Sequence, residues 1–135
     1  MEKINAAQVW SLNYRLLTGV ITEATPGIEA LGLELKEFFV LAEIEECPYP
    51  AELADRLCMP KPSITVYLKN LEAKGFVKRE IDPSDLRRHR LIVTPTGRKA
   101  ATRARNILSE LFGNRLERLS ASEREQFQKL LEKLC

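Results

Sequence analysis

The residues that build metal centres and disulfide frameworks are scarce in this sequence. Its 135 residues include three cysteines, Cys47, Cys58 and Cys135, and a single histidine, His89. No two cysteines form a C-x-x-C pair, so we predict neither a metal site nor a disulfide scaffold, and no cofactor. We interpret the cysteines as reduced structural thiols, with redox sensing by one of them as the alternative.

Long apolar runs and catalytic patterns are absent as well. No segment approaches the ~20 apolar residues that span a membrane, and residues 1–3 lead into a mixed, charged segment instead of a secretory signal. We therefore expect a cytoplasmic protein without a membrane partner. There is no nucleophile–base–acid arrangement and no phosphate-cradling glycine loop, so an enzyme is not predicted.

Charge is unevenly distributed along the chain. Residues 1–60 carry four Lys/Arg and ten Asp/Glu, residues 61–105 carry twelve and four, and residues 106–135 carry five and five. A basic block on a nearly neutral chain is the electrostatic footprint of a protein that binds a polyanion. A membrane surface is the rival partner, but it would require a basic amphipathic helix with large apolar residues, and this block includes a hairpin.

The basic block begins with a helix and a β-hairpin. Residues 60–74 have helical periodicity, and Gly75 follows them as a left-handed C-cap. Residues 76–81 and 89–94 are strand-like, and residues 82–85 (Asp-Pro-Ser-Asp) have turn chemistry. The apolar stripe of the helix consists of Ile64, Tyr67, Leu68 and Leu71.

The outer side of this helix is small, polar or cationic and carries no acid, which suits the major groove of DNA. The hairpin turn is also cationic and suits the negative potential of the minor groove. A basic helix followed by a basic hairpin predicts a winged helix-turn-helix that binds DNA; a winged helix that binds protein is the alternative. The predicted DNA contacts are Lys61, Pro62, Ser63, Thr65, Val66 and Lys69 in the helix, and Arg87, Arg88 and Arg90 in the wing.

Three segments also resemble the signature of MarR-type transcriptional regulators: residues 71–79 (LEAKGFVKR), 82–88 (DPSDLRR) and 93–98 (VTPTGR). Leu86 departs from the family pattern, in which an arginine is common. The resemblance implies that Arg87 enters the minor groove, braced by Asp85. It also implies a repressor or activator that binds an inverted-repeat operator as a homodimer; we favour a repressor.

The fold class follows as mainly α (α+β). We predict a winged helix-turn-helix over residues 34–94 and a helical dimerisation region over residues 1–33 and 95–135. The first helix should end at Pro26-Gly27, and Ser120 and Glu123 should form a capping box before the last helix. The terminal helices carry apolar stripes that need a second copy to cover them. The predicted dimerisation residues are Trp10, Leu17, Leu111, Phe112, Phe127, Leu130, Leu131 and Leu134.

An effector is implied by the resemblance alone. Members of the family often bind small, frequently aromatic acids between the dimer helices and the DNA-binding lobe. Trp10, Tyr14, Phe38 and Phe39 are the candidate lining of such a pocket. Aromatic residues at helical spacing are also typical of an ordinary core, and that interpretation is the alternative.

Overall fold

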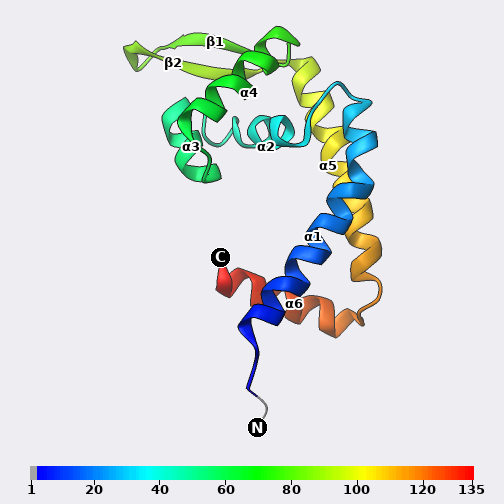
Figure 1. Ribbon diagram of the computed structural model, residues 1–135. Helices are drawn as coiled ribbons and strands as arrows, with labels where there is room; N and C mark the ends of the chain where they lie inside the picture. Colours follow the sequence, from blue (N-terminus) through cyan, green and yellow to red (C-terminus); the bar gives the residue numbers. More distant parts are fainter. Residues whose placement is uncertain (1–2) are drawn as a thin grey trace. The chain divides into compact units, whose positions relative to one another are not determined.

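A computed structural model describes residues 3–135 of the chain, which form two compact units (Figure 1). One unit comprises the N-terminal residues up to Ala24 together with Asn106–Cys135, and the other comprises Thr25–Arg105. The second unit extends beyond residues 34–94 at both ends. Ile28 and Ala104 explain the extension, because both are fully buried and contribute to the core.

The first helix, α1 (Ala6–Glu29), continues through Pro26, so the prediction that it ends there is wrong. A proline inside a helix removes one backbone hydrogen bond and strains the preceding turn. The following turn nevertheless forms, because the Ala30 N–H donates to the Pro26 carbonyl at 3.1 Å. The extra helical turn also buries Ile28 completely, which offsets part of the cost of the proline.

Three short helices form the body of the second unit: α2 (Leu35–Glu43), α3 (Pro50–Leu57) and α4 (Lys61–Ala73). Helix α4 contacts both α2 and α3. Its inner side buries Ile64, Leu68 and Leu71 to 1% exposure or less. Each such side chain contributes about 1.5–3 kcal/mol when it leaves water, so this packing fixes the orientation of α4.

A buried charge links the start of α2 to the end of α4. The Glu37 carboxylate is 1% exposed and accepts from the Lys74 ammonium at 2.6 Å and from the Glu34 N–H at 2.9 Å. Burial by itself would raise the pKa of Glu37, but the backbone hydrogen bond and the ammonium together hold it below the ordinary value. Glu37 is therefore a paired carboxylate that ties the two helices together.

The wing is an antiparallel hairpin of β1 (Val77–Asp82) and β2 (Asp85–Val93). Asp82 pairs with Asp85, but Ile81 pairs with His89 where a regular ladder would place residue 86. Residues 86–88 are consequently extra residues on β2 and lie outside the ladder. Two of them, Leu86 and Arg87, are highly exposed.

Two further helices, α5 (Pro95–Leu116) and α6 (Ala121–Leu134), complete the chain. The predicted capping box is present: the Glu123 N–H donates to Ser120 Oγ at 3.2 Å, and the Ser120 N–H donates to Glu123 Oε1 at 2.8 Å. Near the start of α5, Gly97 permits a close approach, because a Cβ there would lie 2.1 Å from the Phe76 carbonyl oxygen. Within residues 3–135, no helix is both long and apolar enough to cross a bilayer.

Large apolar side chains of the terminal helices remain open to solvent in the single chain. On α1, Trp10 is 74% exposed and Leu17 is 54% exposed; on α6, Leu134 is 83% exposed. Of the other predicted dimerisation residues, Leu130 and Leu131 are exposed, whereas Leu111, Phe112 and Phe127 are half-buried. Exposed large apolar side chains on both terminal helices favour a protein interface.

We therefore expect a homodimer in solution. Sedimentation equilibrium at micromolar concentration should give about twice the 15.4 kDa mass of one chain. The double variant Trp10→Glu, Leu134→Glu should be mostly monomeric, because each new side chain would carry an unpaired charge into the dimer interface. A wild-type protein that stays monomeric at this concentration would contradict the interface.

Candidate nucleic-acid interface

Helix α4 presents the predicted groove-facing residues on its solvent side. Lys61, Pro62, Thr65, Val66 and Lys69 are exposed, and Ser63 is half-buried. Among residues 3–135, neither lysine takes part in an ion pair with a neighbouring acid. The exposed side of α4 therefore carries mostly short side chains, and the positive charge of its lysines is not neutralised by an ion pair within the protein.

Thr65 has a hydrogen bond within its own helix. Its hydroxyl donates to the Lys61 carbonyl oxygen at 3.0 Å, a common bond for threonine inside a helix. A hydroxyl has one proton to donate, so Thr65 keeps only its acceptor capacity towards a partner. Its methyl group is the other part of the side chain that a DNA base can meet.

Arg87 is the most exposed of the three arginines on β2, with 94% of its side chain open to solvent. The Asp85 carboxylate accepts from the Arg87 N–H at 3.0 Å and from its Nε at 3.5 Å. The first bond shapes the backbone of the wing tip as an Asx-type turn, and the second keeps the guanidinium close to the acid. Asp85 is thus placed to set both the path of the tip and the direction of Arg87.

Arg88 lies on the body of the protein. Its guanidinium carbon is 3.5 Å from the centroid of the Tyr49 ring, and its Nη2 is 3.3 Å from Glu52 Oε1 on α3. Stacking on an aromatic face and pairing with an acid both hold an arginine in place. The predicted DNA contact of Arg88 competes with these two interactions.

Tyr49 also holds the base of the wing. Its hydroxyl donates to Asp82 Oδ2 at 2.5 Å, and Asp82 Oδ1 accepts from the Ser84 N–H at 2.9 Å and from Ser84 Oγ at 2.7 Å. These bonds hold the pKa of Asp82 well below its ordinary value, at about 2, with the Tyr49 bond as the largest cause. The same bond raises the pKa of Tyr49. We call Tyr49, Glu52, Asp82 and Arg88 the wing latch.

Three members of the wing latch, Tyr49, Glu52 and Asp82, were not among the residues predicted from sequence. The Asp82–Ser84 turn has a sequence signal, because aspartate two residues before serine is typical of an Asx turn. The Tyr49–Asp82 bond joins residues 33 positions apart, and no local pattern indicates it.

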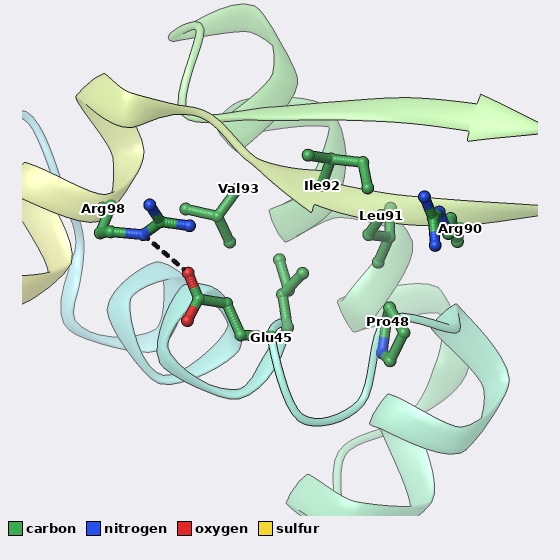
Figure 2. A pocket seen from close by; sticks show the side chains of 8 residues that line it. Glu45, Pro48, Arg90, Leu91, Ile92, Val93 and Arg98 are labelled. Atoms are coloured by element: carbon green, nitrogen blue, oxygen red, sulfur yellow. Dashed lines mark hydrogen bonds and ion pairs between the residues drawn. The ribbon is translucent and has the colours of Figure 1, made fainter.

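Arg90 lines a cavity of about 250 Å³ between β2 and the α2–α3 connection. Figure 2 shows this cavity, with the Glu45–Arg98 ion pair on one side and Arg90 on the other. The Nε is buried and makes no hydrogen bond to any residue of the described part, and Arg90 Nη2 lies 4.0 Å from Glu80. Part of the Arg90 guanidinium is therefore withdrawn from solvent, which limits its reach towards DNA.

The four candidate effector residues belong to different units. Phe38 and Phe39 pack against each other, with ring centroids 5.8 Å apart, and Phe38 is 5% exposed. Trp10 and Tyr14 lie in the other unit, where both are exposed. Within residues 3–135, no group of acids, histidine and cysteines is arranged to hold a metal ion, and the three cysteines are free thiols.

The latch generates a prediction about acid stability. Because Asp82 has a lowered pKa in the folded state, it stabilises the fold above its unfolded pKa near 4, and that stability is lost as the pH falls towards 2. Tyr49→Phe removes the main cause, so NMR titration should show the Asp82 pKa moving up towards 4 and the acid-unfolding midpoint moving to higher pH. Thr18→Val, which removes a hydroxyl bonded within α1, serves as the control and should leave the Asp82 titration unchanged.

Comparison with known proteins agrees with this geometry. The MarR family model matches residues 33–89. The HTH-type transcriptional repressor Rv2887 of Mycobacterium tuberculosis is 31% identical over 125 residues, which cover 91% of this chain and 90% of that protein. The structure of Rv2887 with DNA has a TM-score of 0.76 at 28% identity and covers 98% of both chains. Its complex with p-aminosalicylic acid has a TM-score of 0.73 at 30% identity and covers 92% of this chain and 95% of that chain. The chain belongs to the MarR family of winged helix-turn-helix proteins.

Proposed function

We propose that this chain is a DNA-binding transcriptional regulator, a repressor, that binds an inverted-repeat operator as a homodimer. One observation carries the proposal: α4 buries its apolar side and presents an exposed side with two unpaired lysines and no acid, next to a wing with Arg87 at its tip. In this model α4 enters the major groove and the wing enters the adjacent minor groove. Two-fold symmetry places the half-sites about 10 bp apart.

The relatives support both DNA as the ligand and regulation by a small molecule. Rv2887 is a transcriptional repressor whose solved structures include complexes with DNA and with p-aminosalicylic acid. By analogy, we propose that a small acidic or aromatic effector releases this chain from its operator. Trp10, Tyr14, Phe38 and Phe39 remain our candidates for its binding site.

A protein-binding winged helix is the alternative function, and an enzyme is the third class. The relatives are transcriptional regulators, which supports a regulator without catalytic activity that acts in the cytoplasm, where its DNA ligand lies. A gel shift with random duplex DNA at low salt separates the first two classes. A regulator should bind the duplex with micromolar affinity or better, whereas a protein-binding module should leave it free.

Arg87→Ala should weaken binding to operator and random duplexes by a similar factor. An arginine in the minor groove reads width and potential more than base identity, so its loss removes charge contact without changing the preferred sequence. The slope of log K against log salt should fall by about one phosphate equivalent. Arg124→Ala on α6 is the matched control and should keep the wild-type slope. A variant that loses only operator binding would contradict a minor-groove role.

Asp85→Ala separates the bracing of Arg87 from simple charge. Removing an acid makes the protein more basic, so charge alone predicts tighter DNA binding. Loss of the bond to the Arg87 N–H frees the wing tip, so bracing predicts binding several-fold weaker. Asp85→Asn keeps an acceptor for that N–H while removing the charge, and it should bind more tightly than Asp85→Ala. If both variants bind DNA equally well and more tightly than the wild type at two salt concentrations, Asp85 does not brace Arg87.

A further inference from the structure

The centre of the exposed side of α4 is apolar. At 100° per residue, Pro62, Val66 and Ala73 lie directly opposite the buried stripe. All three are exposed, and Val66 has 55% of its surface open to solvent. None of the three side chains can donate or accept a hydrogen bond. The polar side chains of the helix, including Lys69 and Asn70, flank this line.

The recognition helix of a helix-turn-helix meets base edges with its N-terminal residues. Val66 lies in the second turn of α4, which begins at Lys61, whereas Ala73 is its last residue. The valine is branched at Cβ, and one χ1 rotamer strongly predominates in a helix. Its methyl groups are therefore held in place before DNA binds, so docking costs little side-chain entropy.

In the major groove, an apolar side chain can distinguish thymine from the other bases. Thymine presents a C5-methyl group there, while the other bases present hydrogen-bond donors and acceptors at their edges. An isopropyl group placed against a donor or acceptor removes its water without replacing the lost hydrogen bond. Packed against a methyl group, the same isopropyl group gains contact and buries both surfaces.

On the basis of the proposed function, we propose that Val66 determines operator specificity by packing on the C5-methyl group of one thymine in each half-site. Thr65 supports this recognition. Its hydroxyl proton is bonded to the Lys61 carbonyl, so Thr65, the residue before Val66 on α4, offers no free donor that would favour an acceptor base. Lys69 and Arg87 then supply affinity for the backbone and minor groove, while Val66 supplies preference for thymine.

Uracil tests this inference, because it differs from thymine only by the missing C5-methyl group. A high-affinity duplex is first selected from a random library with the full-length protein. Each thymine is then replaced singly by uracil, and the affinities of the parent protein and Val66→Ala are measured by fluorescence anisotropy. For the parent, one thymine in each half-site should show a three- to fivefold loss on replacement, as expected for one buried methyl group.

Val66→Ala should bind the thymine and uracil duplexes with nearly equal affinity, closing a double-mutant cycle between the side chain and the methyl group. Asn114→Ala, the same kind of exposed polar change but on α5, is the control and should keep the parent's preference. Thermal unfolding should be alike for all three proteins.

Three outcomes overturn the inference, two of them without touching the proposed function. A parent that binds the selected duplex but has equal affinity for thymine and uracil at every position excludes the role of Val66, while the proposed function stands. The same holds if Val66→Ala keeps the full thymine preference. A parent that selects no sequence from the library contradicts the proposed function, and the inference falls with it.

Discussion

Burial of one side of α4 is the constraint on which the rest of the DNA-binding unit depends. Ile64, Leu68 and Leu71 are almost completely buried in the core, and the Glu37–Lys74 ion pair holds the end of the helix against α2. Because a helix has a fixed periodicity, burying these residues also decides which side chains face outward. The position of α2 and α3 under α4 therefore determines what the chain can read on DNA.

The wing depends on a second set of interactions, the wing latch. Asp82 is 3% exposed and keeps its charge because Tyr49 and Ser84 donate hydrogen bonds to it. Arg88 is engaged by Tyr49 and Glu52, and part of Arg90 faces a cavity. The wing thus holds Arg88 against the protein and extends Arg87 into solvent. A hairpin fixed at its base and charged at its tip suits a narrow groove.

Different parts of the protein make different contributions to the proposed DNA binding. Exposed cations on α4 and at the wing tip attract the phosphate backbone whatever its sequence, and an apolar line on α4 discriminates between bases. The exposed apolar residues of α1 and α6 favour a second copy, which would double both contributions. Affinity, specificity and assembly then rest on different residues, so single substitutions are able to separate them.

Much of the architecture could be predicted from local sequence. Helical periodicity, Gly75, the Ser120 capping box and the turn at residues 82–85 are short-range signals, and each corresponds to an observed feature. The helix through Pro26 could not be predicted in this way, because burial of Ile28 outweighs a local helix-breaking signal. The positions of Arg88 and Arg90 could not be predicted either, since Arg88 contacts Tyr49 and Glu52 and Arg90 lines a cavity with Glu45 and Pro48, all far away in the chain. Sequence by itself determined the helices, the hairpin and the cationic character of the block, because those depend on neighbouring residues. Only the tertiary structure decided which cations are free to contact DNA, because some of the cationic side chains are held by residues that are distant in the sequence.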